Sequence, residues 1–269
     1  MSIPPSNRVI EAFGGKPPAI RIRGGQETTW AAANVIIKPL DTSLEVIQWQ
    51  ASTFSSLMGR SDLQLSAPRK TPNGDIVLEG WTAWDRLEGS SEHQGRWDEI
   101  IRAGQIFSDI VKDVPRPPFL DARDDPWAIA DRIAWGEIPA DAVLHVRYIE
   151  DLLKRRSSRT PTCEASQLIH GDLTGNVLLS ETHVPAVIDI SPYWRPRSFA
   201  TAIVVVDALT WEEAPLEWGR KYLQDDSQKQ AFIRALLFRV LSDFFRCPTE
   251  PVSDLFQRSM QLLAEVFVQ

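Results

Sequence analysis

The chain has 269 residues, of which 43% are hydrophobic and 24% charged, and these ordinary globular values exclude a disordered protein. The formal charge is −7 and no long basic run is present, so nucleic acid is not expected as a partner. The most apolar stretch, 199–206, is too short to span a bilayer, and the first residues do not form a signal peptide. Cys163 and Cys247 lack metal-ligand spacing and fit a reduced compartment, so a cytoplasmic protein without a membrane partner is predicted.

Short strands and turns are predicted for the first part of the chain, up to about residue 88. The apolar run at 35–37 indicates a buried strand, and the polar residues at 41–43 can cap a following helix. The sequence at 71–74 is a turn signal between two strand candidates. We expect strands at 19–23, 30–39 and 75–79, and a helix at 44–58.

Helical periodicity dominates the chain after Gly89. Asp125 before Pro126 has the form of an N-cap followed by proline at the first helical position. This order predicts an α+β protein of two lobes, a small β-rich lobe at 1–88 and a larger, mainly helical lobe at 89–269. We expect helices at 97–111, 125–135, 140–156, 198–210, 227–246 and 252–267, with a strand-turn-strand unit at 168–190.

The residues that can carry chemistry follow two apolar strand candidates. The first strand leads into a loop that holds Asp172 and Asn176, and the second strand ends at Asp189. Magnesium prefers oxygen ligands, usually one or two carboxylates together with substrate phosphates, and Asn176 and Asp189 supply such oxygens. Asp172 is then left to accept the proton of an incoming hydroxyl. Phosphoryl transfer needs little beyond positioning and charge neutralisation, so the pattern predicts a magnesium-dependent phosphotransferase.

The segment His170-Gly171-Asp172, with Asn176 and Asp189 downstream, resembles the catalytic core of the aminoglycoside phosphotransferase and choline kinase-like family, which shares the protein-kinase fold. The resemblance extends from about residue 20 to 245, although only the stretch from His170 to Asp189 is specific. It implies an enzyme that binds ATP and Mg²⁺ and transfers the γ-phosphate to a hydroxyl of a small molecule, such as an amino sugar, an aminoglycoside or another polar metabolite. In that family Asp172 would be the base, and Asn176 and Asp189 the magnesium ligands.

Two further residues, one in this motif and one downstream of it, have expected supporting roles. His170 is expected to pack and hydrogen-bond within the loop, where it orients rather than reacts. Asp207 matches, by the same resemblance, the aspartate that steadies the catalytic loop. The stretch 191–196, together with 207–209, is also similar to an uncharacterised actinobacterial branch of the family.

The catalytic loop departs from the family pattern, because four steps separate Asp172 from Asn176 where family members have five. Asn176 reaches a metal only if the turn tightens, which Gly175 makes easier; otherwise Asp189 alone holds one ion. The shortened loop leaves open an alternative, a nucleotide-binding pseudokinase with a regulatory or scaffolding role. A protein-substrate kinase is disfavoured, because a helix is expected almost directly after Asp189.

The nucleotide is predicted to bind to the first lobe. Lys38 ends a buried strand, and in kinases a lysine on such a strand holds the α- and β-phosphates of the nucleotide. Glu45 is the only carboxylate on the following helix that could pair with Lys38. A glycine turn before that strand can cradle phosphate through backbone amides. The adenine is expected against the crossing at 81–86, through backbone groups. The predicted nucleotide-binding residues are Lys38, Glu45, Gly24, Gly25, Ala83 and Trp84.

The acceptor is predicted to bind where acidic and aromatic residues alternate in the helical lobe. Carboxylates there would attract amines, and aromatic faces would stack on rings or cations. Helix caps, solvated carboxylates and core tryptophans are the alternative interpretation of the same residues. The predicted acceptor residues are Asp124, Asp125, Trp127, Asp131, Trp135 and Trp194.

Overall fold

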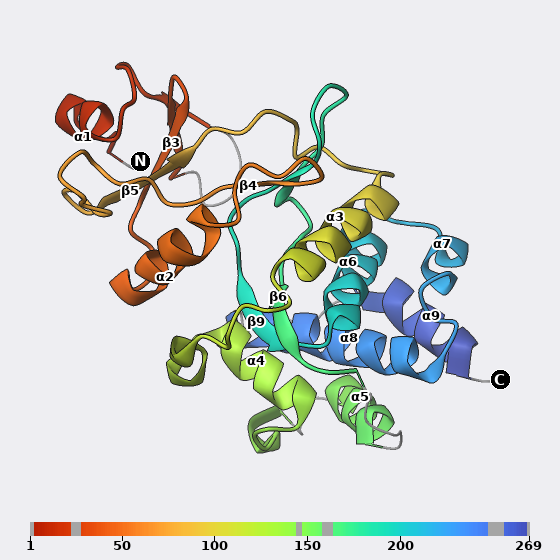
Figure 1. Ribbon diagram of the computed structural model, residues 1–269. Helices are drawn as coiled ribbons and strands as arrows, with labels where there is room; N and C mark the ends of the chain where they lie inside the picture. The colour runs from red at the N-terminus through yellow and green to blue at the C-terminus, as the bar shows by residue number, and fades with distance from the viewer. Residues whose placement is uncertain (1–2, 23–27, 144–146, 158–163, 247–255, 268–269) are drawn as a thin grey trace. The chain divides into compact units, whose positions relative to one another are not determined.

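The computed structural model describes residues 3–22, 28–143, 147–157, 164–246 and 256–267 (Figure 1). The chain forms two compact units. The first unit is made of Met1–Ser91 and Val177–Asp189, and the second of Glu92–Asn176 and Ile190–Gln269. The sequence places the whole of 89–269 in one lobe, whereas the structure groups Val177–Asp189 with the first unit, because strands of this segment pair there.

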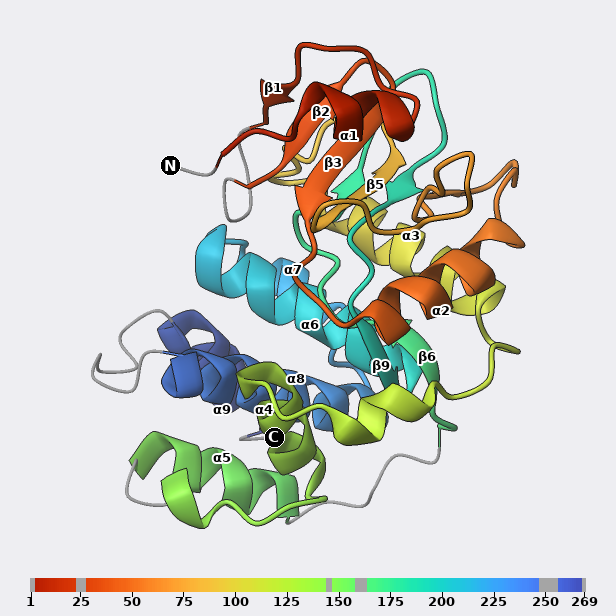
Figure 2. The same ribbon diagram turned by 90° about the vertical axis from the view of Figure 1, so that its left-hand side faces the viewer.

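The first unit contains a four-stranded antiparallel sheet with the strand order β1-β2-β3-β5 (Figure 2). Val35 and Ile37 in β3 are fully buried and alternate with less buried neighbours, as expected of a strand with one face in the core. The single strand expected at 30–39 is a hairpin instead, because Ala33 takes a φ of 55° and turns the chain back. The strands are β1 (Ile20–Arg21), β2 (Trp30–Ala32), β3 (Val35–Pro39) and β5 (Trp81–Asp85).

Two helices pack on these strands. The helix α1 (Asn7–Ala12) was not predicted from the sequence; its buried side chains join those of β2, β3 and β5 in one apolar cluster. The helix α2 (Leu44–Ser55) begins at the expected cap, where the Ser43 hydroxyl accepts a hydrogen bond from the Val46 backbone N–H. Its buried face packs near Trp84 of β5.

A smaller sheet of the first unit has the order β4-β8-β7, with β4 parallel to β8 and β8 antiparallel to β7. Among the described residues, the strand predicted at 75–79 is not formed. Glu79 and Gly80 both take positive φ and make a tight turn, across which Leu78 and Trp81 exchange backbone hydrogen bonds. The strands of this sheet are β4 (Gln64–Leu65), β7 (Val177–Leu178) and β8 (Ala186–Val187).

Helices dominate the second unit (Figure 1). The helix α6 packs against α3, α8 and α9, and most of its side chains are buried, as expected of a helix that is apolar on most of its surface. The helix α8 packs against α4, α5 and α6. The helices are α3 (Trp97–Ile110), η1 (Pro118–Ala122), α4 (Pro126–Trp135), η2 (Asp141–Val143), α5 (Arg147–Ser157), α6 (Arg197–Trp211), α7 (Leu216–Arg220), α8 (Asp226–Arg246) and α9 (Gln257–Phe267).

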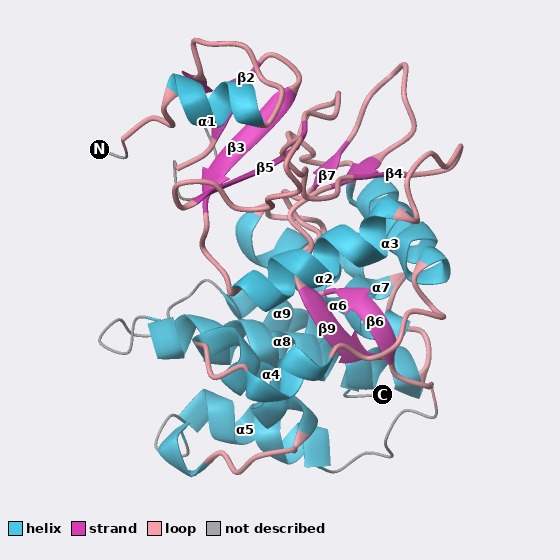
Figure 3. Ribbon diagram, turned by 60° about the vertical axis from the view of Figure 1, so that its left-hand side comes forward, coloured by secondary structure: helices cyan, strands magenta, loops and turns pink. Residues whose placement is uncertain are grey.

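One strand pair accompanies these helices: β6 (Gln167–His170) runs antiparallel to β9 (Pro192–Arg195) (Figure 3). Neither β9 nor α7 was predicted, since a helix was expected almost directly after Asp189. The α+β class, with a small sheet region and a larger helical part, is confirmed. Within the described parts of the chain, no helix combines the length and apolarity needed to cross a membrane.

Candidate active site

The predicted catalytic loop, residues 170–176, begins at the last residue of β6 in the second unit. The Gly171 backbone N–H donates to the Ser191 carbonyl at 2.9 Å, which continues the pairing of β6 with β9 beyond the strand ends. A Cβ at position 171 would collide with the ring of Tyr193, so glycine is needed for this close approach. The start of the loop backbone is therefore held beside the residue that precedes β9.

His170 is buried at the start of this loop, with 1% of its surface exposed. Its Nδ1 accepts a hydrogen bond from the Asp172 backbone N–H at 3.0 Å, and its ring lies edge-on to Phe107. Because Nδ1 acts as the acceptor, a neutral ring carries its proton on Nε2. His170 thus orients the backbone of Asp172.

Asn176 closes the loop on Asp172. Its Nδ2 donates to the Asp172 carbonyl at 2.7 Å and lies 3.4 Å from the Asp172 Oδ2 atom. Gly175, with a φ of 80°, makes the tight turn that the shortened loop requires. Since Nδ2 is used for this contact, the Oδ1 atom of Asn176 is the oxygen that can serve a cation.

A residue that the sequence analysis missed, Arg239 of α8, holds the Asp172 side chain. Arg239 Nη2 donates to Asp172 Oδ1 at 2.8 Å, and the same guanidinium binds both carboxylate oxygens of Asp207 at 2.7 and 2.6 Å. Burial by itself lowers the pKa of Arg239, but the two carboxylates outweigh it and raise that pKa above its ordinary value. Asp207, expected to steady the loop, is buried and reaches Asp172 through Arg239. An arginine inside an otherwise apolar stretch of helix was the available signal.

In the first unit, Lys38 of β3 forms an ion pair with Asp189, and its Nζ lies 4.4 Å from the ring centre of Trp84. The expected partner, Glu45, lies exposed in the first turn of α2, and among the described residues no ion pair joins it to Lys38. The predicted pairing with Glu45 is therefore not formed among the described residues. The reason is that β8 brings Asp189 to the end of β3, whereas Glu45 faces outward from its helix.

The oxygen donors suit magnesium in kind. Asp189 supplies a half-exposed carboxylate on a left-handed backbone, with a φ of 48°, and Asn176 supplies an amide oxygen. Within the described ranges no group of three or more His, Cys, Asp or Glu could hold a metal. Magnesium does not require such a group, because it commonly takes one or two protein oxygens together with phosphates and water.

The other residues predicted to bind the nucleotide are two residues of β5 and the two glycines of the predicted turn before β2. The Ala83 carbonyl accepts from the Arg69 backbone N–H at 2.7 Å, and Trp84 bridges to Pro68 on one side and pairs with β3 on the other. The strand β5 therefore has neighbours along both edges, and the role of these two residues toward adenine stays a prediction. Gly24 and Gly25 lie outside the described residues.

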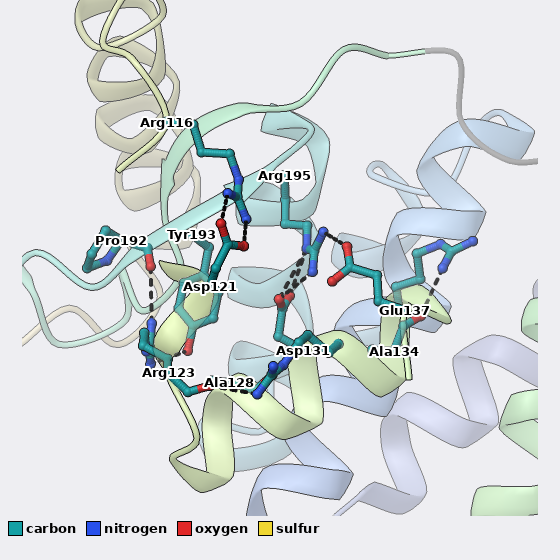
Figure 4. Close-up of polar contacts among 12 residues, drawn as sticks. Arg116, Asp121, Arg123, Ala128, Asp131, Ala134, Glu137, Pro192, Tyr193 and Arg195 are labelled. Atoms are coloured by element: carbon teal, nitrogen blue, oxygen red, sulfur yellow. Dashed lines mark hydrogen bonds and ion pairs between the residues drawn. The ribbon is translucent and has the colours of Figure 1, made fainter. Parts of the chain in front are cut away.

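Two predicted acceptor carboxylates are engaged within the second unit, and Figure 4 shows one of them, Asp131, beside Arg195. Asp125 caps α4 by accepting from the Ala128 backbone N–H at 3.0 Å, and it pairs with Arg123 at 2.8 Å. Asp131 is buried and pairs with Arg195 through two guanidinium nitrogens, at 3.0 and 2.6 Å. Burial raises the pKa of the Asp131 carboxyl, and Arg195 acts against that rise. These contacts give both aspartates structural roles, so we do not propose either as a group that binds the acceptor.

The other predicted acceptor residues differ in how far their side chains are buried. Trp135 packs edge-on to Phe199, and Arg195 and Arg234 lie over its ring, which gives this partly buried side chain a packing role. Asp124 is exposed, Trp127 is 37% exposed, and Trp194 is partly buried on β9. Their role toward an acceptor stays a prediction.

Three comparisons set this chain against known proteins. No protein-family model matches it, and no curated protein matches its sequence. Among solved structures it is similar to the apo form of a thermostable mutant of aminoglycoside phosphotransferase APH(4)-Ia, at 15% identity and a TM-score of 0.62, over 97% of this chain and 99% of that one. It is also similar to the AMP-bound spectinomycin phosphotransferase APH(9)-Ia, at 14% identity and a TM-score of 0.57, over 98% of this chain and 95% of that one. A third similar structure is the choline kinase LicA from Streptococcus pneumoniae, at 12% identity and a TM-score of 0.56, over 96% of this chain and 97% of that one.

These likenesses cover nearly the whole of each chain. They show that this protein has the kinase-like fold that small-molecule phosphotransferases share. At such low identity the fold is what they establish, and the chemistry has to be argued from the residues.

Proposed function

We propose that this chain is an ATP- and magnesium-dependent phosphotransferase that moves the γ-phosphate of ATP to a hydroxyl of a small polar molecule. The observation that carries the proposal is the held carboxylate of Asp172, which His170 orients through the backbone and Arg239 through Oδ1. Its side chain remains 48% exposed, so a substrate can reach it. The kinase-like fold supports this choice, since a related mutant enzyme of that fold was solved with AMP-PNP and hygromycin B.

The division of labour follows from the chemistry of each group. Asp172 accepts the hydroxyl proton of the acceptor and orients the attacking oxygen. Lys38 offers a cation to the nucleotide phosphates, and the first unit is then the nucleotide-binding one. Magnesium, when bound with the nucleotide, supplies charge neutralisation on the transferred group, and we assign its protein ligands to Asn176 and Asp189.

The acceptor is proposed as a hydroxylated, polar small molecule. Its charge is left open, because the structure pairs Asp125 and Asp131 with arginines, which weakens the argument for a cationic ligand. Trp127 and Trp194 remain the proposed aromatic contacts.

The test is a phosphorylation assay with ATP and magnesium against hygromycin B, spectinomycin, choline, amino sugars and common metabolites. Phosphorylated product, identified by mass spectrometry and absent without magnesium, supports the proposal. An Asp172→Asn variant provides the matched control, because it retains the shape of the side chain and loses the base. Turnover that is equal in that variant would contradict the assignment of Asp172.

A second candidate is a nucleotide-binding pseudokinase. The observation that favours it is the ion pair between Lys38 and Asp189, which occupies one of the oxygens proposed for magnesium. Such a protein would bind Mg-AMP-PNP and yet hydrolyse no ATP with or without any acceptor, so the same assay separates the two functions.

A further inference from the structure

Arg239 connects the catalytic loop to the interior of the second unit. Its side chain is 9% exposed, and two of its nitrogens are fixed on Asp207 of α6, which is 1% exposed. One of these nitrogens, Nη2, also donates to Asp172 Oδ1 at 2.8 Å. A planar guanidinium fixed at two nitrogens has little freedom left, so its hydrogen bond to Asp172 has a set direction.

Aromatic rings restrain the guanidinium further. Its Cζ atom lies 5.7 Å from the ring centre of Trp211 and 5.3 Å from that of Phe238, within the range of cation–π contact. Trp211 ends α6 and Phe238 belongs to α8, and these two helices pack against each other. The packing of two helices therefore sets the place of Arg239.

The contact leaves the two oxygens of Asp172 in different states. Oδ1 accepts from Arg239, whereas Oδ2 is 3.4 Å from Asn176 Nδ2, which is long for a strong hydrogen bond. Oδ2 is thus the oxygen that remains for an acceptor hydroxyl. Without Arg239 the carboxylate could rotate, and it would spend only part of its time in the productive orientation.

We propose that Arg239 is a positioning residue for phosphoryl transfer, which holds Asp172 by Oδ1 so that Oδ2 faces the acceptor hydroxyl. The inference rests on the proposed function and goes beyond it, because Arg239 acts through Asp172 and touches no substrate itself. No sequence motif points to this residue.

Arg195 of β9 offers a matched control, since it too joins a buried aspartate to a half-exposed carboxylate. In Arg239→Lys and Arg195→Lys the charge is kept, so neither buried aspartate is left unpaired and both proteins should fold. The readouts are the rate of magnesium-dependent ATP hydrolysis, in which water replaces the acceptor hydroxyl, and the affinity for Mg-AMP-PNP. We expect Arg239→Lys to lower kcat about tenfold or more with nucleotide affinity within about twofold, and Arg195→Lys to remain near the wild type.

The methionine variants extend this series. Arg239→Met and Arg195→Met should lose thermal stability to a similar extent, because each leaves a buried aspartate without its cation. Only Arg239→Met should lower kcat by about a hundredfold, with the lysine variant intermediate. Equal kcat values for the two lysine variants would overturn the inference, as would a loss of nucleotide affinity in Arg239→Lys without a change in kcat. A wild-type protein that neither binds Mg-AMP-PNP nor hydrolyses ATP would overturn the proposed function first, and the inference with it.

Discussion

Two clusters of the second unit share one arrangement, a buried arginine between a buried aspartate and a half-exposed carboxylate. In the Arg239 cluster the exposed fractions of the side chains are 9% for Arg239, 1% for Asp207 and 48% for Asp172. By charge and burial alone, this cluster is a structural ion-pair network.

The Arg195 cluster is nearly the same in these terms. Its exposed fractions are 11% for Arg195, 9% for Asp131 and 48% for Glu137. The hydrogen bonds differ in one respect: Arg239 contacts both of its carboxylates through Nη2, whereas Arg195 binds Asp131 through Nε and Nη2 and Glu137 through Nη1 (Figure 4).

The two clusters differ in what surrounds the half-exposed carboxylate. Asp172 belongs to a loop whose backbone His170 holds and whose turn Asn176 closes. Glu137 follows the last turn of α4, where its backbone N–H donates to the Arg132 carbonyl. A buried arginine between two carboxylates therefore does not by itself indicate a reactive site, and we assign reactivity to Asp172 because of the loop that carries it.

The largest expected effect separates the two half-exposed carboxylates. Asp172→Asn should lower turnover by about a hundredfold or more, because the amide cannot accept the acceptor proton. Glu137→Gln, which makes the equivalent change in the Arg195 cluster, should leave turnover within about twofold. Steady-state kinetics with ATP and the acceptor found in the panel would show this. Similar losses in both variants would mean that the clusters are equivalent after all.

A third cation–carboxylate pair, Lys38 with Asp189 in the first unit, can be compared with an exposed ion pair of the same unit. Asp189→Ala should abolish the magnesium-dependent rise in melting temperature that ATP produces, because a ligand that binds only the native state raises its stability. Asn176→Ala should reduce that rise only in part.

The control for this experiment is Asp62→Ala, which removes the exposed pair with Arg60 in the same unit. It should retain the full magnesium-dependent rise. A rise that persists in Asp189→Ala would remove Asp189 from the metal site.

The loop can also be disturbed without any change of charge. Gly171→Ala places a Cβ against the ring of Tyr193 and should lower the free energy of unfolding by about 1–3 kcal/mol, the usual cost of overpacking. Gly175→Ala meets open space but keeps a φ of 80°, so about 1 kcal/mol is expected there. Urea unfolding measures both values. A Gly171→Ala protein as stable as the wild type would show that the Tyr193 ring yields easily.

The smallest expected effect concerns Tyr193, which lies on β9 two positions before Arg195. Burial raises the pKa of Tyr193 to about 12, above its ordinary value of about 10. The native state holds this proton more tightly, so the stabilisation is complete below pH of about 10 and is lost as the pH rises through about 12. By this linkage the loss at pH of about 11 is about 1 kcal/mol.

Urea titrations of the wild type and Tyr193→Phe between pH of about 9 and 11 provide the measurement. The free energy of unfolding should decline less steeply in the phenylalanine variant. Identical slopes would show that Tyr193 ionises equally well in the native and unfolded states.

Much of the fold could be predicted from the sequence, because its signals are local. The helix α4 begins at Asp125 and Pro126 as expected, since a cap and a proline act on the backbone beside them. The helix α3 follows directly from apolar spacing. The short strand β9 was missed, because strand pairing depends on a partner that is distant in the chain.

The sequence by itself determined which residues of the catalytic loop could carry chemistry. His170, Asp172 and Asn176 lie within one short motif, where covalent spacing alone keeps them together. The tertiary structure decided which charges pair, because Arg239 lies 67 positions from Asp172 and Arg195 lies 64 positions from Asp131. A buried charge must find a partner in the low-dielectric interior, but the packing of distant helices and strands chooses which one. For this reason an acidic stretch that suggested an acceptor site contains structural ion pairs, while Arg239, which no motif marks, contacts Asp172, the proposed base.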